Sequence, residues 1–371
     1  MSQSPGSRIP MALMLVPNAY RALLRPLLFR LPPETAQRVA DSVLRLGPIW
    51  KTLAPALNYS NTSLQTSLSG LKLRNPVGLA AGYDKNCEFL HSLAALGFGY
   101  VTGGTVTPNI QPGNRRPRII RYTEEQSLVN SLGFPNQGVE RVLGNLEAST
   151  ASLSVPRVVS VSGTTVEEIV TCHRQIEPLV SAVEINISSP NTQGLRVFHD
   201  TYVLAELLEA VSNHSQKPLF VKIPPYMSKD VEKGGSEDRT MVLGVVDVCA
   251  DHRVDGITVA NTWPVRDDRL AVGRGGLSGK PIFDDMIRMV GEIRSAVGKS
   301  VAINACGGIF TGEDAWAALH AGADTVQVLT GLVYCGPGIV RSINKDLAHL
   351  MDRYELDSID QIRDLPLPHS G

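Results

Sequence analysis

The chain has 371 residues, 35 of them basic and 36 acidic, so no charge excess favours nucleic acid as a partner. That length fits either one α/β barrel with an extra element or two ordinary domains. Its five cysteines are scattered without a Cys-x-x-Cys pair. This usage predicts reduced thiols in an intracellular protein, with no zinc or iron–sulfur site.

The N-terminal region is apolar but interrupted. Residues 1–8 are polar, and residues 9–29 are broken by Pro17, Arg21, Arg25 and Pro26. No run approaches the roughly 20 uninterrupted apolar residues that cross a bilayer, and no signal-peptide cleavage pattern occurs. The segment therefore predicts neither a membrane span nor a secretory leader.

Two short amphipathic helices are predicted in this region. The first ends at Pro32-Pro33 and the second covers residues 34–46. Leucines crowd one side of the first helix, with arginines elsewhere on it: Leu23, Leu24, Leu27, Leu28 and Leu31. Such a pair either lies in a membrane interface or packs on the domain behind it, and the pattern alone leaves both interpretations open.

From residue 71 onward, short apolar strands alternate with helical segments. The strand candidates are residues 75–82, 99–103, 157–161, 183–187, 219–223, 256–259, 301–305 and 325–328. The helical segments are residues 86–96, 166–176, 202–212, 241–252, 283–297, 312–321 and 339–351. This alternation predicts a closed parallel (β/α)8 barrel of the TIM type.

Two segments do not fit the alternation. Residues 105–147 are too long for an ordinary loop between a strand and a helix, and long loops in compact domains usually carry function. Residues 224–238 are polar and contain glycine, and we expect a mobile flap there.

Polar side chains recur at the carboxyl ends of the predicted strands, where barrels of this type hold their active sites. Asn186, Ser188, Ser189 and Asn191 follow an apolar run. By themselves they could form a turn that satisfies its own backbone. The other strand ends repeat the arrangement, however, with Lys85, Thr105, Ser160, Ser162, Lys222, Asn261, Thr262 and Thr330. The repetition favours a ligand site.

The last strand ends indicate a phosphorylated ligand. Gly307-Gly308 and Thr330-Gly331 would let a phosphate approach the backbone, with the N-terminal amides of the following helices pointing at it. Lys222 stands alone in an apolar strand, and a buried ammonium needs an anionic partner. Beside a flavin, it would stabilise the negative charge of the reduced ring.

These motifs resemble the dihydroorotate dehydrogenase family, most closely its quinone-dependent, membrane-associated class. The resemblance runs from about Tyr20 to Val340 and rests on several motifs in the same order. They are residues 75–86, 105–108, 113–118, 186–192 and 275–281, with the two glycine loops above.

The resemblance implies an FMN cofactor and a dihydroorotate substrate that leaves as orotate. The FMN-site residues would be Ala80, Ala81, Gly82, Thr105, Ser160, Asn186, Lys222, Ala260, Gly279, Gly308, Leu329 and Thr330. The substrate-site residues would be Lys85, Asn130, Ser131, Leu132, Gly133, Phe134, Asn186, Asn191, Asn261 and Thr262. Amides can read the donors and acceptors of a pyrimidine ring, and Lys85 can pair with its carboxylate.

The resemblance also assigns Ser189 as the base that removes the C5 proton of the substrate, while the C6 hydride passes to the flavin. Cytosolic relatives, which use fumarate or NAD, carry cysteine there. A serine hydroxyl is a poor base unaided, so its proton needs a relay.

Several positions depart from the quinone-dependent class. Residues 130–136 and 221–226 lean toward the fumarate-linked class, and Ser160, Ala260 and Leu329 replace residues usual at FMN hydrogen bonds. A fumarate-linked enzyme and a barrel that binds FMN without turnover therefore remain alternatives.

The N-terminal extension matches the quinone-dependent class and shifts the interpretation of the helix pair. We expect residues 1–65 to form a quinone-access segment on a membrane, and residues 66–371 to form the catalytic FMN barrel. The implied location is the cytoplasmic face of a bacterial cell membrane, with peripheral attachment, a membrane quinone as electron acceptor and no nucleic-acid partner.

Overall fold

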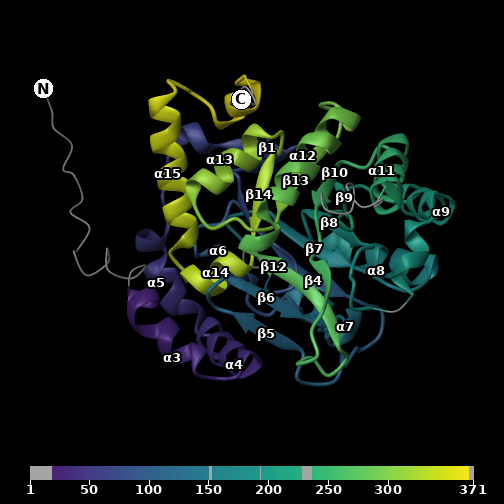
Figure 1. Cartoon of the computed structure of the whole chain (residues 1–371), viewed down its shortest axis with the longest axis horizontal. Coiled ribbons are helices and arrows are strands. Elements are labelled where there is room, and N and C mark those ends of the chain that lie inside the picture. The colour runs from purple at the N-terminus through teal and green to yellow at the C-terminus, as the bar shows by residue number, and fades with distance from the viewer. Residues whose placement is uncertain (1–18, 150–152, 193, 228–235, 367–371) are drawn as a thin grey trace, which may run out of the picture.

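A computed structural model describes residues 19–149, 153–192, 194–227 and 236–366 (Figure 1). Its centre is a closed barrel of parallel strands in the order β10-β13-β14-β3-β4-β7-β8-β9. The strands are β3 (Val77–Leu79), β4 (Tyr100–Val106), β7 (Arg157–Val161), β8 (Ala182–Asn186), β9 (Leu219–Lys222), β10 (Gly256–Val259), β13 (Ala302–Cys306) and β14 (Thr325–Val328). The predicted (β/α)8 barrel and its eight strands are confirmed.

Helices cover the outside of the barrel. They are α6 (Leu90–Ala94), α7 (Gly138–Ala148), α8 (Val166–Ile176), α9 (Thr201–Ser212), α11 (Ser236–Asp251), α12 (Phe283–Val297), α13 (Gly312–His320), α14 (Thr330–Cys335) and α15 (Ile339–Arg353). Short helical turns join them: η2 (Thr62–Leu64), η3 (Glu177–Leu179), η4 (Leu195–His199), η5 (Lys280–Ile282) and η6 (Ile359–Asp364). The predicted helices at 166–176 and 283–297 have the expected bounds.

The helix predicted at residues 86–96 is much shorter. It begins only at Leu90, because the Asp84 carboxylate accepts the backbone N–H groups of Glu88 at 2.9 Å and Phe89 at 2.7 Å. These bonds hold the chain in a loop through residue 89. The loop that follows β3 therefore carries Tyr83 and Lys85 toward the barrel mouth.

The amino-terminal end of the barrel is closed by a hairpin of β1 (Thr66–Leu68) and β2 (Leu71–Leu73). Leu68 and Leu73 pack there against inward-facing barrel side chains, among them Val158 and Phe220. Burial of large apolar side chains contributes about 1.5–3 kcal/mol each. The hairpin fills this end of the barrel with apolar side chains.

The open end carries a four-stranded antiparallel sheet in the order β11-β12-β6-β5. Its strands are β5 (Ile119–Tyr122), β6 (Ser127–Asn130), β11 (Trp263–Arg266) and β12 (Arg274–Gly279). The long excursion at residues 105–147 thus folds into β5, β6 and α7. The flap predicted at residues 224–238 lies largely in residues 228–235, outside the described residues.

The N-terminal helices lie beside β5 and β6 (Figure 1). They are the π-helix η1 (Tyr20–Leu24), α3 (Arg25–Phe29), α4 (Pro33–Leu44) and α5 (Gly47–Leu57). The two expected helices are present, whereas α5, with prolines at positions 48 and 55, was not predicted. Among the described residues, no helix has the length and apolarity to cross a membrane.

Specific contacts fasten these helices to the barrel domain. The Tyr20 hydroxyl donates to the Val333 carbonyl at 2.7 Å, and Glu34 forms an ion pair with Arg118 at 2.9 Å. Arg121 donates to the carbonyls of Phe29 and Leu31, and its guanidinium lies over the Phe29 ring. One side of the helix pair is therefore packed.

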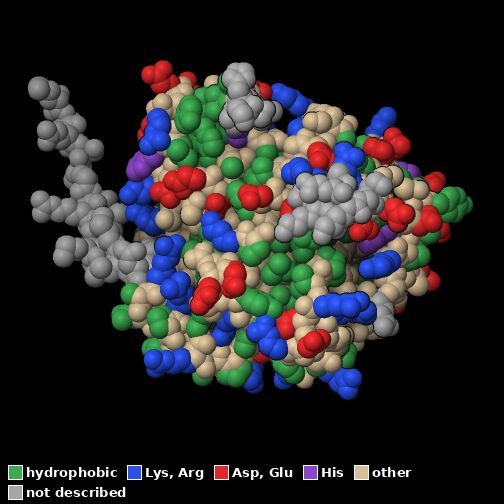
Figure 2. Space-filling model, viewed as in Figure 1, with side chains coloured by type: hydrophobic (Ala, Val, Ile, Leu, Met, Phe, Trp, Pro, Cys, Tyr) green, Lys and Arg blue, Asp and Glu red, His purple; other side chains and the backbone are tan. Residues whose placement is uncertain are grey.

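Other side chains of the same helices face outward, including Leu23 at 66% and Leu27 at 59% exposure. Figure 2 shows hydrophobic and basic side chains next to each other over this corner. The two interpretations of the helix pair are thus not exclusive, because the pair packs on one side and exposes leucines on the other.

Candidate active site

A cavity of about 630 Å³ extends from the carboxyl ends of the barrel strands to the space between α3 and α4. Most of the residues predicted for the site line it: Ala80, Ala81, Gly82, Lys85, Thr105, Asn130, Leu132, Gly133, Phe134, Asn186, Ser189, Asn191, Lys222, Ala260, Asn261, Thr262, Gly279, Gly308, Leu329 and Thr330. Strand ends that are far apart in the sequence therefore line the same cavity.

Two predicted residues are not among those that line the cavity. Ser160 is fully buried, and its hydroxyl lies 3.1 Å from the Thr105 hydroxyl, so Ser160 supports a lining residue. Ser131 is also fully buried, and its hydroxyl has no hydrogen-bond partner. Neither side chain therefore lines the cavity itself.

The predicted asparagines form two hydrogen-bonded pairs that line the cavity. The Asn186 amide donates to the Thr105 hydroxyl at 3.0 Å, and its oxygen accepts the Asn261 amide at 3.3 Å. The Asn191 amide donates to the Asn130 carbonyl at 3.0 Å. The side-chain oxygen of Asn191 is buried without a partner. A buried acceptor left unsatisfied costs about 1–3 kcal/mol, and a ligand N–H group in the cavity would remove that cost.

Ser189 lies in the turn after β8. Its hydroxyl oxygen accepts two long hydrogen bonds of 3.4 Å, one from the Asn191 backbone N–H and one from the Thr192 hydroxyl. The Ser189 hydroxyl proton is committed to neither of these bonds, since Ser189 is the acceptor in both. The group can therefore exchange a proton with a ligand in the cavity.

Lys85 supplies a positive charge at the side of the cavity. Its ammonium donates to the Gly82 carbonyl at 2.8 Å. Burial lowers the pKa of Lys85, while the carboxylates of Asp41 and Asp84 act in the opposite direction. A ligand carboxylate would add to those two charges and favour the ammonium form.

Lys222 supplies a second positive charge, at the floor of the cavity. It is the last residue of β9 and only 5% exposed. Its ammonium lies 3.7 Å from the Cys306 sulfur. Burial lowers its pKa, but Cys306 and Glu184 raise it and prevail, so the pKa of Lys222 lies above its ordinary value.

Glycine loops border the cavity where the phosphate was expected. Gly279 has φ +100°, and a side chain there would come within 2.3 Å of the Gln126 carbonyl oxygen. Gly308 has φ +72° and would meet Phe283 at 2.6 Å. Both positions require glycine, and the backbone there is open to the cavity.

The two helix termini expected to face an anion differ in how their first amides are bonded. At α13 the Thr311 hydroxyl accepts the Asp314 N–H at 3.1 Å, and the Asp314 carboxylate accepts the N–H groups of Phe310 and Thr311. This capping box occupies the N–H groups of residues 310, 311 and 314 at the start of α13. The first amides of α14 have no intrahelical partner, and Thr330 and Gly331 line the cavity.

Among the lining residues that the sequence analysis did not assign to the site are Cys306, Ser278 and Gln327. Ser278 lies inside the recognised motif at residues 275–281, and Cys306 directly precedes Gly307-Gly308, but neither was assigned to the site. Gln327 projects from β14, is 3% exposed, and its side-chain oxygen has no partner. A glutamine between two valines of an apolar strand is the sequence signal that could have identified Gln327 as a site residue.

The other half of the cavity is apolar. It lies between the N-terminal helices and is lined by Leu24, Leu27, Leu28, Phe29, Ala36, Val39, Ala40, Val43 and Leu44. Leu24 and Leu27 are also strongly exposed, so this half opens toward the leucine-rich surface. The arrangement can admit an apolar molecule from that surface to the polar half.

Known proteins share this architecture and sequence. The family model for dihydroorotate dehydrogenase matches residues 63–351. A Methylococcus capsulatus protein named dihydroorotate dehydrogenase (quinone) is 39% identical over 352 residues, which cover 89% of this chain and 99% of the relative. A Sinorhizobium fredii protein of the same name is 36% identical, over 94% of this chain and 96% of the relative.

Solved structures agree with these sequence relatives. The ligand-free Eimeria tenella dihydroorotate dehydrogenase superposes with a TM-score of 0.78 at 27% identity, over 90% of this chain and 100% of that chain. The same enzyme in complex with ferulenol has a TM-score of 0.73 at 28% identity, over 85% of this chain and 93% of that chain. The chain belongs to the dihydroorotate dehydrogenase family.

Proposed function

We propose that this chain is a flavin-dependent dihydroorotate dehydrogenase that passes electrons to a membrane quinone. It oxidises (S)-dihydroorotate to orotate in the biosynthesis of UMP. The observation that carries the proposal is the single cavity, which joins a pocket lined by lysines and asparagines to an apolar channel between two N-terminal helices. The names of the Methylococcus and Sinorhizobium relatives support the same activity.

The residues at the cavity floor fit FMN. Lys222 offers a buried positive charge and Gln327 an unsatisfied side-chain oxygen, while Gly308 and the first amides of α14 suit a phosphate. When bound, FMN supplies the hydride acceptor and the carrier that returns electrons to a second substrate. Ala80, Ala81, Gly82, Thr105, Asn186, Ala260, Gly279, Leu329 and Thr330 would complete its site, with Ser160 behind Thr105.

Other residues would hold and activate dihydroorotate. Lys85 would pair with the carboxylate, and Asn130, Asn191 and Asn261 would bond to the ring, with Asn186 shared between the two ligands. Gly133, Phe134 and Thr262 would enclose the substrate.

Ser189 would take the proton from the substrate carbon. The Thr192 hydroxyl lies 3.4 Å from the Ser189 hydroxyl and donates to it, so Thr192 could receive a proton from Ser189 only after its own hydroxyl turns to become the acceptor. General-base groups of this kind contribute about 10²–10⁴-fold to rate.

The N-terminal segment, residues 1–65, would be the quinone-access and membrane-binding part, and residues 66–371 would be the catalytic barrel. Its exposed leucines next to Arg21, Arg25 and Arg30 suit a peripheral position at an anionic membrane surface. The cytoplasmic face of the cell membrane is where this attachment would place the protein.

One experiment tests both half-reactions. The purified protein should be yellow, dihydroorotate should bleach the flavin absorbance under anaerobic conditions, and a short-chain ubiquinone should restore it. Absence of bleaching would overturn the dehydrogenase assignment. Efficient restoration by fumarate instead of quinone would overturn only the electron acceptor.

A further inference from the structure

A polar layer crosses the barrel interior directly beneath the cavity floor. Its central residue is Glu184 in β8, which is 1% exposed. One carboxylate oxygen accepts the Thr258 hydroxyl at 2.8 Å, and the other is buried without a hydrogen-bond partner. The residue is neither part of the cavity lining nor part of the apolar core.

The hydrogen bonds of this layer run in one direction. The Thr325 hydroxyl donates to the Asn304 side-chain oxygen at 2.6 Å. The Asn304 amide donates to the Thr258 hydroxyl at 3.4 Å, and that hydroxyl donates to Glu184. Because each member is a donor toward the next, the chain ends on Glu184 as an acceptor. An ionised carboxylate is an acceptor only, so this direction of the hydrogen bonds suits a carboxylate at the end of the chain.

The ammonium of Lys222 lies in the next layer toward the cavity. In the pairing of β8 with β9, Glu184 is opposite Phe220 and Asn186 is opposite Lys222. Side chains two positions apart on a strand share a face, so Lys222 stands one inward-facing position above Glu184. The two charges do not form a direct ion pair, but Glu184 is among the groups that raise the pKa of Lys222.

We propose that Glu184 is a positioning residue that acts as the buried counter-charge of Lys222 and thereby sets the redox potential of the bound FMN. The inference rests on the proposed function, because it requires a flavin on Lys222. A lone buried ammonium would act with its full charge on the reduced flavin and stabilise it. Glu184 offsets part of that charge, so the reduced flavin is bound less tightly and returns its electrons more readily.

The alternative role is structural, as an acceptor that completes the Thr258 hydrogen bond. The two roles differ in what they predict for the flavin. Removing a purely structural acceptor would lower the stability of the fold and leave the relative binding of oxidised and reduced FMN unchanged. Removing a counter-charge favours the reduced state, since a carboxylate and an anionic flavin repel each other.

The test is the midpoint potential of FMN in the holoenzyme, measured by spectroelectrochemistry. In Glu184→Gln, we expect reduced FMN to bind about tenfold more tightly relative to oxidised FMN, which is a positive shift of about 30 mV for a two-electron couple. Glu184→Asp keeps the negative charge, but its side chain is one methylene shorter. It should therefore shift the potential in the same direction as Glu184→Gln, but by less. Oxidised FMN should bind within a few-fold of wild type in both variants.

Thr258→Val is the matched control, because it removes the hydrogen bond to Glu184 and leaves both charges. Its potential should stay close to that of wild type. An unchanged or more negative potential in Glu184→Gln would overturn the inference, as would an equal shift in Thr258→Val. If Glu184→Gln does not fold, an unchanged potential in Glu184→Asp overturns it.

Failure of the proposed function would look different. A wild-type protein that neither retains FMN nor takes it up would overturn the function and this inference together. A flavin-loaded wild type that dihydroorotate bleaches, but whose potential is insensitive to Glu184, would overturn this inference alone.

Discussion

Ser189 is the residue on which the proposed chemistry depends most directly. We expect Ser189→Ala to retain FMN and to lose flavin reduction by dihydroorotate by about 10²–10⁴-fold, the usual contribution of a general base. Anaerobic stopped-flow absorbance of the flavin measures this step by itself. Ser188→Ala is the matched control: Ser188 bonds to Asn186 and Asn261, so its loss should weaken substrate binding more than the reduction rate. Near-wild-type reduction in Ser189→Ala would assign the base to another group.

A second residue-scale prediction concerns His173, a fully buried imidazole in α8. The His214 Nδ1 lies 3.1 Å from the Ala210 carbonyl, which only accepts, so His214 donates from Nδ1. Its Nε2 must then accept from His173 Nδ1 at 3.1 Å, which leaves His173 Nε2 as a buried acceptor without a partner. Burial lowers the pKa of His173 from 6.5 to about 4, with Glu177 acting against the shift and His214 adding to it.

The lowered pKa makes the folded state sensitive to acid. Above pH 6.5 the imidazole is neutral whether the chain is folded or not. Between about pH 6.5 and pH 4, His173 is protonated in the unfolded chain but stays neutral in the folded chain. As the pH falls through this range, the free energy of unfolding therefore decreases by up to about 1.4 kcal/mol per pH unit. His173→Leu should reduce this slope in urea unfolding between pH 4 and 6.5. The same slope in the variant would contradict the assignment.

At the residue scale, the sequence indicates cavity residues where a polar side chain interrupts an apolar pattern at a strand end. Lys222, Asn186 and Thr105 stand out in this way, and all three line the cavity. Glu184 also interrupts an apolar run, at residues 182–185, but it lies inside the strand and not at its end, so it was overlooked. Its role depends on Thr258 and Lys222, which come from other strands, and no local pattern reports such a contact.

At the scale of elements, the barrel strands were predictable because each is a short run buried on both faces. The antiparallel sheet over the barrel mouth was not. β12 contains three glycines and β11 contains a proline, which argue against strands locally. They are strands because β12 pairs with both β11 and β6. Tertiary pairing overrides local preference there.

The helix pair α3 and α4 leads to a prediction about the second half-reaction. Ala36 is a buried residue of α4 that lines the apolar half of the cavity. Ala36→Trp should fill this channel and slow flavin reoxidation by ubiquinone at least tenfold. Flavin reduction by dihydroorotate should stay within a few-fold of wild type, since the polar half is unchanged. Stopped-flow measurement of both half-reactions separates the two effects.

The control for this variant adds the same bulk elsewhere in the segment. Ile49 of α5 is 47% exposed, and Ile49→Trp should leave reoxidation unchanged. Equal reoxidation rates in Ala36→Trp and wild type would place the quinone route outside the channel.

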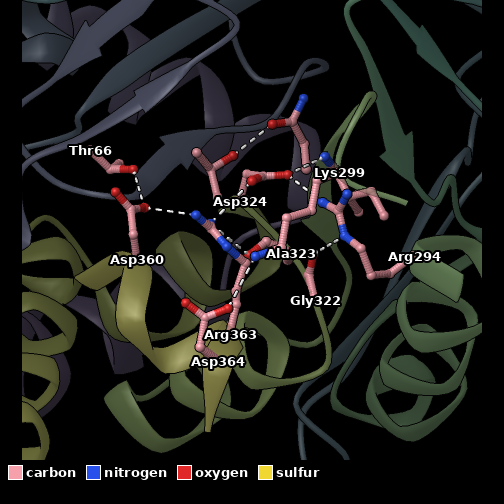
Figure 3. Close-up of polar contacts among 12 residues, drawn as sticks. Thr66, Arg294, Lys299, Gly322, Ala323, Asp324, Asp360, Arg363 and Asp364 are labelled. Atoms are coloured by element: carbon pink, nitrogen blue, oxygen red, sulfur yellow. Dashed lines mark hydrogen bonds and ion pairs between the residues drawn. The ribbon is translucent and has the colours of Figure 1, made fainter. Parts of the chain in front are cut away.

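At the scale of the whole molecule, the two ends of the barrel differ in what they contain. The carboxyl end holds the cavity, and the amino end holds an ion-pair network that ties distant segments together (Figure 3). Figure 3 shows Asp324, just before β14, between Arg294 of α12 and Arg363 of η6. Its carboxylate pairs with Arg294 at 2.5 Å and with Arg363 at 3.0 Å, and accepts the Ile303 N–H at 2.7 Å.

The network leads to a stability prediction that leaves the site untouched. Asp324→Asn removes the charge between two guanidinium groups and should lower the free energy of unfolding by about 2 kcal/mol. The Asp324 side chain is 19% exposed, so the loss should fall between that of an exposed pair and that of a buried pair. Asp364→Asn is the matched control at the same end, because the Lys299–Asp364 pair is exposed, with 86% and 66% of its side chains accessible. That pair should contribute no more than about 1 kcal/mol.

Urea unfolding at neutral pH measures both effects, and the flavin reduction rate of the folded fraction should match wild type in each variant. A loss in Asp324→Asn no larger than that in Asp364→Asn would show that the amino end of the barrel is held by its apolar hairpin alone. A changed reduction rate would show instead that the two ends of the barrel are coupled.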